Sequence, residues 1–489
     1  MVITFMQIFN TLSQKKEALS PKKQRINLFV CGPTVYDYPH IGHARTYIVF
    51  DVLVRYLKAR GFKTFYLQNI TDVDDKIIVR AKKENKKPDE LARFFTKEYK
   101  KDMKKLDVAS INKYAEASKF IPEIIKQVTT LINKNYAYKI KDDGIYFDIS
   151  KFSDYGKLSK RTTEQAEDAI SRIDTSKNKK NRGDFCLWKF PKLEIIQDRK
   201  WKNYKKVLTR DGEPAWFTPL GWGRPGWHIE DTAITEKFFG PQYDIHGGGI
   251  DLKFPHHEAE IAQQESASGK KPFVKIWMHT GSLLVNGKKM SKSLNNFISI
   301  EKFLGKYDPL ILRWIVLNHH YRSPINYTDS LTNQAQNSLN SVQEFLRKLQ
   351  KVIDSKNEKG ENFNLKNNLK TAQEEFFTGM DNDLNTAFAI AHIFDFGLKY
   401  QKQIWQMKSS EAKLLKKYIE FLLNILGINL KSLKLPPKVI KIVKNRELCR
   451  THKQFIQADV LRKKINKLGY EVEDTPTGPF IKTSSKNTP

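Results

Sequence analysis

The sequence predicts an α/β fold in which a parallel sheet is interrupted by an insertion and followed by helices. Two strand–helix–strand patterns lead to this prediction. The first has a strand at 26–32, a helix at 43–61 and a strand at 63–72, and the second lies within 242–284. A strand, a helix and a second strand at such spacing form a βαβ unit, so both stretches indicate parallel pairing.

The segment between the two βαβ units breaks this alternation and contains the polar run SKNKKNRGD. We interpret it as an insertion that splits the sheet domain. After Leu304 the pattern becomes helical, with long amphipathic segments at 331–350 and 411–426, and Pro436–Pro437 precedes a small terminal module. The predicted division is a first half of the sheet domain at 1–114, an insertion at 115–205, a second half at 206–304, a helical bundle at 305–430 and a C-terminal module at 438–489.

Net charge gives a first indication of a partner. Lysine and arginine number 85 against 54 acidic residues, a formal charge of +31. Such an excess attracts polyanions and speeds their capture. Solvated lysine-rich helix faces would give the same count, so the charge permits an RNA partner without establishing one.

Composition also indicates the cellular compartment. Apolar residues make up 40% of the 489 residues, enough for real cores, yet no run of about 18 apolar residues could span a membrane. Residues 1–10 lack a positive leader and a small-residue cleavage site. The three cysteines are far apart in sequence, which favours a reducing compartment over a disulfide framework. We therefore expect a cytoplasmic protein with no membrane association.

The segment CGPTVYDYPHIGHAR, residues 31–45, joins the first predicted strand to its helix. In open α/β sheets this edge binds nucleotides, and a helix N-terminus favours phosphate. His40 and His43 are three residues apart and can face one phosphate. A lone pair of histidines at this spacing could equally cap the helix.

The segment Lys289-Met290-Ser291-Lys292-Ser293 follows the last predicted strand. Two lysines and two hydroxyls on a loop can hold the β- and γ-phosphates of ATP and stabilise charge on leaving pyrophosphate. Taken alone, such a segment could also be a solvated lysine loop.

Together, HIGH and KMSKS in this order, on a split α/β domain, resemble the Rossmann-like catalytic domain of class I aminoacyl-tRNA synthetases. The surrounding residues narrow the resemblance. NITDVDDKII, GRPGWHIE, DIHGGGIDLKFPHHEAEIAQ and the ending GYEVEDTPTG are similar to the cysteinyl-tRNA synthetase family, in family order and over nearly the whole chain.

This resemblance implies a zinc site in which the metal takes the substrate thiol. Cys31, His256 and Glu260 match ligand positions, and a helix would place the last two on one face. A borderline-soft metal binds thiolate well and rejects the hydroxyl of serine. Packing alone distinguishes one methylene by only ~1–3 kcal/mol.

The fourth ligand position departs from the family pattern. The family has a second cysteine after GWHIE, and this chain has Asp231. Carboxylate is a harder ligand than thiolate. Three outcomes are open, in order of preference: Asp231 coordinates the metal, the site keeps three ligands and an open position, or metal affinity falls severely.

The resemblance assigns further residues to the substrates. The amino acid would lie among Gly32, Thr34, Thr71, Trp227, His246 and Asp251, with Asp251 facing the ammonium group and Trp227 forming a wall. Trp227 could instead be a core residue. ATP would contact His40, Gly42, His43, Gly247, Gly249 and Lys292, while His40, His43, Lys289 and Lys292 would assist the chemistry.

The implied reaction has two steps. Cysteine attacks the α-phosphorus of ATP, with Mg²⁺ and Lys292 offsetting charge, and pyrophosphate leaves. The terminal ribose of tRNA-Cys then attacks the adenylate, at its 2′-hydroxyl if the class habit holds. Positioning and electrostatics would supply most of the catalysis.

Recognition of the tRNA is weaker in the sequence. Arg450, Asp459 and Asp474 fall at positions that resemble anticodon contacts, where a guanidinium can stack on or bond to an unstacked base. Each could equally be an ordinary surface charge. A monomer is expected.

The sequence disfavours three alternatives. A ligase that joins cysteine to an aminosugar resembles the catalytic half but lacks the terminal module. A non-catalytic RNA-binding relative would not need both signature motifs. Another class I synthetase is disfavoured by Cys31 together with PHHEAE.

Overall fold

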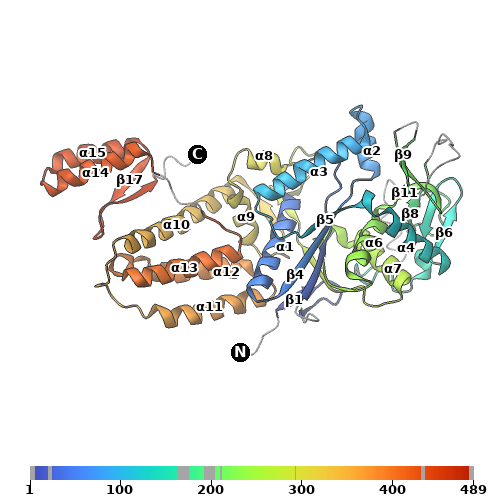
Figure 1. Cartoon of the computed structure of the whole chain (residues 1–489), viewed down its shortest axis with the longest axis horizontal. Coiled ribbons are helices and arrows are strands. Elements are labelled where there is room, and N and C mark those ends of the chain that lie inside the picture. Colours follow the sequence, from blue (N-terminus) through green and yellow to red (C-terminus); the bar gives the residue numbers. More distant parts are fainter. Residues whose placement is uncertain are drawn as a thin grey trace. The chain divides into compact units, whose positions relative to one another are not determined.

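A computed structural model of the chain describes two compact units. The first unit comprises residues up to Thr328 together with Asp381–Asn385, and the second comprises Asp329–Met380 and the chain from Thr386 (Figure 1). The described residues are 6–19, 25–161, 176–191, 204–209, 212–291, 293–430 and 435–483.

A five-stranded parallel sheet forms the centre of the first unit. Its strand order is β13-β12-β3-β4-β5, and every neighbouring pair is parallel. The strands are β3 (Arg25–Val30), β4 (Lys63–Ile70), β5 (Lys113–Glu116), β12 (Tyr243–Gly249) and β13 (Val274–Thr280). β3 and β12 come from opposite sides of the insertion and lie side by side, so the predicted split α/β fold is confirmed.

Helices cover both faces of this sheet (Figure 1). α1 (Ile41–Ala59) lies on one face. It is buried over most of its length and packs against α9 (Pro309–Leu317). On the other lie α6 (Trp227–Phe239) and α7 (His256–Ser268). The other α-helices in the described part of the unit are α2 (Asp75–Lys83), α3 (Pro88–Lys105), α4 (Ile121–Asn133) and α8 (Ile300–Leu304).

The insertion carries an antiparallel sheet of its own. The strand order is β6-β7-β8-β11-β10-β9. The strands are β6 (Ala137–Ile140), β7 (Gly144–Phe147), β8 (Phe185–Lys189), β9 (Lys206–Leu208), β10 (Pro214–Thr218) and β11 (Gly221–Pro225). This sheet runs past residue 205, where the sequence was expected to return to the parallel sheet.

Short strands complete the first unit. β1 (Gln7–Asn10) pairs with β2 (Lys15–Ala18). β14 (Leu283–Val285) pairs with β15 (Lys288–Lys289) and, in parallel, with β16 (Ile325–Tyr327). The KMSKS segment therefore begins at the end of β15.

The second unit is mostly helical, as predicted. It contains α10 (Asp329–Asp354), α11 (Leu365–Asp381), α12 (Thr386–Gln401) and α13 (Ser409–Ile425), and a terminal part built from α14 (Pro437–Thr451), α15 (Phe455–Lys467), β17 (Tyr470–Glu473) and β18 (Phe480–Thr483). The terminal part has a small core of its own, at Val439, Val443, Ile465, Val472 and Ile481.

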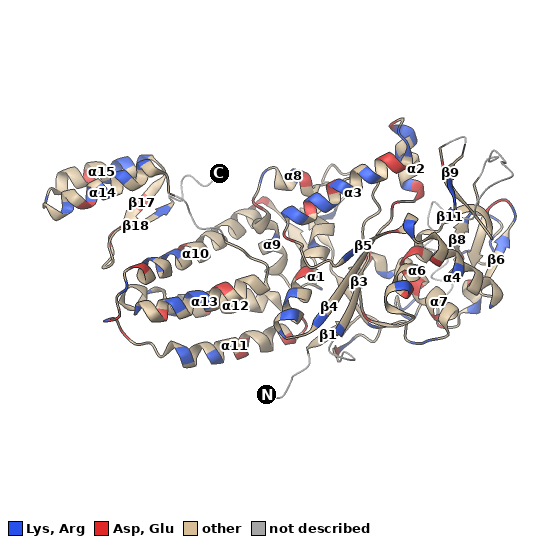
Figure 2. Cartoon of the chain, in the orientation of Figure 1, with Lys and Arg blue, Asp and Glu red and all other residues tan. Residues whose placement is uncertain are grey.

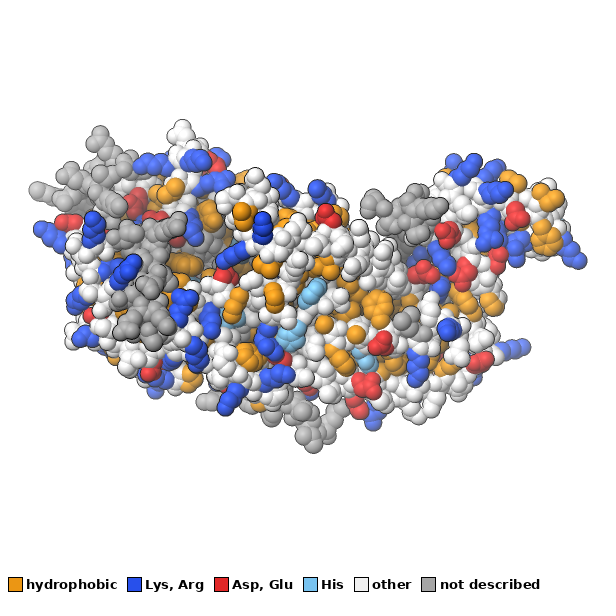
Figure 3. Space-filling model, turned by 180° about the vertical axis from the view of Figure 1, so that it is seen from behind, with side chains coloured by type: hydrophobic (Ala, Val, Ile, Leu, Met, Phe, Trp, Pro, Cys, Tyr) orange, Lys and Arg blue, Asp and Glu red, His pale blue; other side chains and the backbone are white. Residues whose placement is uncertain are grey.

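Lysine and arginine residues are spread over the described elements of both units (Figures 2 and 3). Among the described helices, none is both long and apolar enough to cross a bilayer.

Candidate active site

The candidate site lies where the two halves of the parallel sheet meet. Cys31 directly follows β3, and His246 lies in the middle of the adjacent strand β12. The chain leaves β3 and β12 toward opposite sides of the sheet, and open α/β sheets bind ligands at such a switch point.

Four buried donor groups converge here. Cys31, Asp231, His256 and Glu260 each bring one ligand atom within 4.8 Å of the others. Asp231 Oδ2 lies 3.1 Å from His256 Nε2 and 3.5 Å from Cys31 Sγ. Glu260 Oε1 lies 3.0 Å from His256 Nε2. The helix spacing predicted for His256 and Glu260 is the one that α7 provides.

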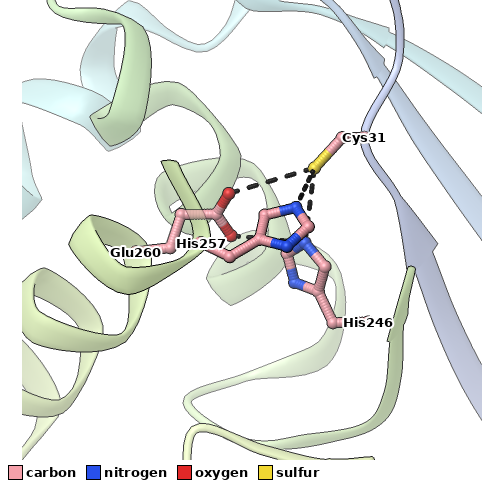
Figure 4. Close-up of side chains that lie close together, drawn as sticks. All are labelled: Cys31, His246, His257 and Glu260. Carbon is pink, nitrogen blue, oxygen red and sulfur yellow. Dashed lines mark hydrogen bonds and ion pairs between the residues drawn. The ribbon is translucent and has the colours of Figure 1, made fainter. Parts of the chain in front are cut away.

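A second set of donors shares two of these residues. Figure 4 shows Cys31 and Glu260 together with His246 and His257, and this set also meets the 4.8 Å limit. Cys31 Sγ lies 3.1 Å from His257 Nε2 and 3.3 Å from His246 Nε2. Two ions cannot each have a full set, because Cys31 and Glu260 belong to both.

Charge accumulates in this buried space. Burial, with Glu260 and Asp231 nearby, holds the pKa of Cys31 well above its usual value. Burial raises the pKa of Glu260 to about 7, although His256 opposes the shift. Burial disfavours protonated His256, but Glu260 and Asp231 outweigh it and raise its pKa to about 9. A cation between the two carboxylates is therefore favoured.

These groups fit a divalent metal of the zinc type. The first set offers one sulfur, one imidazole nitrogen and two carboxylate oxygens, all ligands that zinc accepts. Glu260 Oε2 is buried and makes no hydrogen bond in the described part of the chain, although His246 Nε2 lies 3.4 Å away. Such an atom is costly to bury without a donor or a cation to satisfy it.

Asp231 is held in place by Asn69. Asn69 Nδ2 donates to Asp231 Oδ1 over 2.5 Å, while Asn69 Oδ1 accepts from Gly32 N. The other carboxylate oxygen, Oδ2, faces Cys31 and His256. A Cβ at position 32 would lie 1.8 Å from the Asn69 carbonyl oxygen, so only glycine permits this approach.

A cavity of about 350 Å³ opens beside these donors. It is lined by ten of the predicted site residues: Cys31, Gly32, Thr34, His40, Gly42, His43, Trp227, Gly249, Asp251 and Lys289. Trp227 is half-buried and stacks on His256 with ring centroids 4.1 Å apart, so it joins the cavity to the donor cluster rather than to a core.

His40 and His43 combine helix capping with a place at the cavity wall. His40 caps α1, because its Nδ1 accepts from Gly42 N and its own N–H donates to His43 Nδ1. Both rings also line the cavity. Burial lowers the pKa of His40 to about 4 and holds that of His43 well below its usual value, so both are neutral at pH 7.

The KMSKS segment reaches the same cavity. Lys289 and Met290 line it, and Ser291 N donates to Asn296 Oδ1 over 2.9 Å. Lys292 lies outside the described residues.

Several predicted residues lie away from the cavity wall. Thr71 forms a bridge with Thr34 and is buried. His246 is buried behind Cys31, and its Nδ1 is 2.6 Å from the Tyr243 hydroxyl. A Cβ on Gly247 would meet the Phe50 ring at 2.2 Å, so this glycine permits close packing under the strand end.

Comparison with known proteins gives the family. The family described as "tRNA synthetases class I (C) catalytic domain" matches residues 18–337, and "DALR domain" matches 375–431. Cysteine–tRNA ligase of Thermoplasma volcanium is 41% identical over 96% of this chain and 98% of its own length. The chain belongs to the cysteine–tRNA ligases. It is a class I synthetase and has cysteine–tRNA ligase activity.

Other relatives agree. Cysteine–tRNA ligases of Thermococcus onnurineus and Caldicellulosiruptor saccharolyticus are 38% and 39% identical, over 98% and 97% of this chain and 99% of their own lengths. Among solved structures, Mycobacterium tuberculosis methionyl-tRNA synthetase with methionyl-adenylate aligns with a TM-score of 0.55 at 12% identity, covering 83% of this chain and 90% of that one. This likeness supports the class I fold alone.

The residues predicted to contact the anticodon lie in the terminal part of this cysteine–tRNA ligase family member. Asp474 accepts from Arg446 over 2.7 and 2.8 Å and lies 3.2 Å from Arg450. Asp459 is exposed on α15. Asp474 therefore orients Arg446 and Arg450 before any RNA contact.

Sequence reasoning missed some residues of the site. Lys76 lines the cavity, with its Nζ 5.9 Å from the Trp227 ring and 5.7 Å from the Tyr36 ring. It lies inside NITDVDDKII, which carried the family resemblance but received no role. The sequence pattern assigned no role to His257, the neighbour of His256. It assigned none to Asn69 either, because the partner of Asn69, Asp231, is 162 residues away.

Proposed function

We propose that this cavity activates L-cysteine with ATP and Mg²⁺ and that the chain then transfers cysteine to the 3′-terminal ribose of tRNA-Cys. One observation carries the proposal. The cysteine thiol of Cys31, at the end of β3, faces Asp231, His256 and Glu260 at the edge of a cavity that both signature motifs reach.

ATP would occupy the part of the cavity between the start of α1 and the KMSKS segment. His40 and His43 are neutral and can donate hydrogen bonds to phosphate, and the N-terminus of α1 favours negative charge. Lys289 and Lys292 would offset the charge that develops on leaving pyrophosphate. Gly42 and Gly249 leave room for the nucleotide; a Cβ at position 42 would lie 2.8 Å from the His40 ring.

Cysteine would lie toward the donor cluster. Two carboxylates line this cavity, Asp37 and Asp251. Asp37 pairs with Arg80 over 2.8 Å, so Asp251, beside Gly249, is the better partner for the ammonium group. Trp227 would wall the side chain, and Gly32 and Thr34 would border it. Thr71 would position Thr34, and His246 would position Cys31, both from behind the cavity wall.

Cys31, Asp231, His256 and Glu260 would hold one zinc ion. Bound there, zinc supplies a Lewis acid with affinity for thiolate sulfur, which distinguishes cysteine from serine. Asp231 Oδ2 already faces His256 and Cys31, which supports direct coordination over a three-ligand site. Asn69 would keep that oxygen aimed at the metal, as hydrogen-bonded partners of ligating carboxylates do.

Recognition of tRNA-Cys is assigned to the second unit, with Arg450 as the anticodon contact and Asp474 as the residue that orients it. A cytoplasmic location and a monomeric state remain predictions from the sequence.

ATP–pyrophosphate exchange tests this function. Purified protein is assayed with each amino acid in turn, and its metal content is measured on the same sample. We expect exchange with cysteine alone and about one zinc per chain. Comparable exchange with serine or methionine would refute the assignment.

A further inference from the structure

A short segment of the first unit is covalently tied to the helices of the second. Asp381–Asn385 belongs to the first unit, yet it connects α11 to α12. Asp383 and Leu384 have left-handed backbone angles, with φ of 65° and 49°. The segment therefore makes a tight turn whose side chains enter the first unit.

Asp383 is the centre of a buried network. Its side chain has no exposed surface, and its Oδ1 accepts from the Tyr321 hydroxyl over 2.6 Å and from Phe9 N over 2.8 Å. Oδ2 accepts from Arg322 Nε over 2.8 Å. A buried carboxylate with this many donors fixes the residues that carry them.

The residues that Asp383 fixes hold Arg45 through their backbone. Arg45 Nη2 donates to the carbonyl oxygens of Tyr321, over 3.0 Å, and of Ser323. Arg45 Nη1 donates to the carbonyl of Ser282 over 2.6 Å. Arg45 lies on α1, two residues after His43, and is buried.

The same contacts reach the wall of the cavity. Gly281, Ser282 and Leu283 line it, and Gly281 N donates to the Tyr321 carbonyl over 2.8 Å. A Cβ on Gly281 would lie 2.5 Å from the Arg322 carbonyl oxygen, so the wall and the 320–323 segment touch backbone to backbone. The β14 strand that follows this wall leads through β15 into KMSKS.

We propose that Asp383 is a positioning residue for the ATP end of the cavity, acting through Tyr321, Arg322 and Arg45. The proposal rests on the proposed function only in taking this cavity as the ATP site. The cysteine end is built from β3, β12 and α7, and none of the hydrogen bonds given above for Asp383 and Arg45 reaches these elements.

Asp383→Asn tests the proposal, because it keeps the side-chain size and removes the charge that Tyr321 and Arg322 share. We expect the Kd for ATP–Mg²⁺, measured by equilibrium binding without cysteine, to rise roughly three- to thirtyfold. In exchange assays the KM for ATP should rise by a similar factor, and the KM for cysteine should stay within about twofold of wild type. The matched control is Asp395→Asn, an exposed aspartate on α12, which should change neither constant.

A purely structural role would lower the fraction of active enzyme and leave both KM values unchanged. An unchanged ATP Kd in folded Asp383→Asn protein would overturn the proposal. If that variant does not fold, Tyr321→Phe takes its place, because it removes the hydroxyl that donates to Asp383. Tyr321→Phe should raise the Kd for ATP, and an unchanged Kd would overturn the proposal. In a double-mutant cycle, Asp383→Asn and Arg45→Lys should be non-additive in ATP Kd, whereas additive effects would contradict action through Arg45.

A failure of this proposal can be distinguished from a failure of the proposed function. A wild-type protein that binds ATP but does not activate cysteine would refute that function, and the comparison of ATP affinities would still stand.

Discussion

Replacing Asp231 with alanine should loosen zinc without abolishing it. Asp231 contributes one of four donor atoms, and Cys31, His256 and Glu260 remain. Loss of one ligand or of its orienting partner lowers metal affinity ~10–100-fold, which corresponds to about 1.4–2.7 kcal/mol. The buried Asn69 Nδ2 also loses its 2.5 Å acceptor, which costs a further ~1–3 kcal/mol of stability.

The assay is competition for zinc with a chromophoric chelator, at constant pH, on wild type and variants. Asp231→Cys should bind zinc more tightly than wild type and keep cysteine activation, because thiolate donates more electron density. The matched control is Asp244→Ala on β12. That carboxylate accepts from Asn27 N over 2.9 Å at the far end of the strand, so its loss should leave zinc affinity unchanged.

An unchanged zinc affinity in Asp231→Ala would refute direct coordination by Asp231 and would favour the set that contains His246 and His257. In that case His257→Ala would be the variant that releases the metal, and Asp231 would serve only to hold Asn69.

Three further predictions concern other parts of the chain. Lys292→Ala should slow adenylate formation ~10²-fold or more with little change in cysteine binding, as measured by exchange and calorimetry, and near-normal turnover would mean that this lysine is only solvated. A chain that ends near Leu430 should still form cysteinyl-adenylate but should charge tRNA poorly at low tRNA concentration; undiminished charging would exclude an anticodon contact in the terminal part. In urea unfolding, the free energy of unfolding should fall as the pH drops below about 6.5. The folded-state pKa is about 4 for His40 and about 3 for His279, so the unfolded chain binds more protons than the folded chain in this range. Each of these two histidines should contribute about 1.4 kcal/mol per pH unit between pH 5.5 and 4.5, and His279→Asn should remove its share of that slope, whereas an equal slope in the variant would contradict the assignment.

Local patterns predicted the parallel sheet and the helices well, because period and spacing are properties of a short window. The strand at 26–32, the helix at 43–61 and the spacing of His256 and Glu260 follow from such windows and agree with β3, α1 and α7. The strands β9 to β11 were not predicted, since they are short and interrupted by glycine and proline.

Contacts between distant residues could not be predicted in this way. Nothing near Asn69 indicates that its amide would meet Asp231, and nothing near Asp383 indicates that its carboxylate would meet Tyr321. For His40 the sequence offered capping and phosphate binding as alternatives. The capping ring also lines the cavity, and phosphate binding stays a prediction.

Zinc K-edge X-ray absorption tests the central claim, that a metal held by Cys31, Asp231, His256 and Glu260 selects cysteine through its sulfur. The free enzyme should show one sulfur and one imidazole in the zinc shell, with oxygen completing it. Addition of L-cysteine should raise the sulfur count to two, and addition of L-serine should leave it at one. A sulfur count that stays at one with saturating cysteine, in protein that still forms cysteinyl-adenylate, would contradict the account.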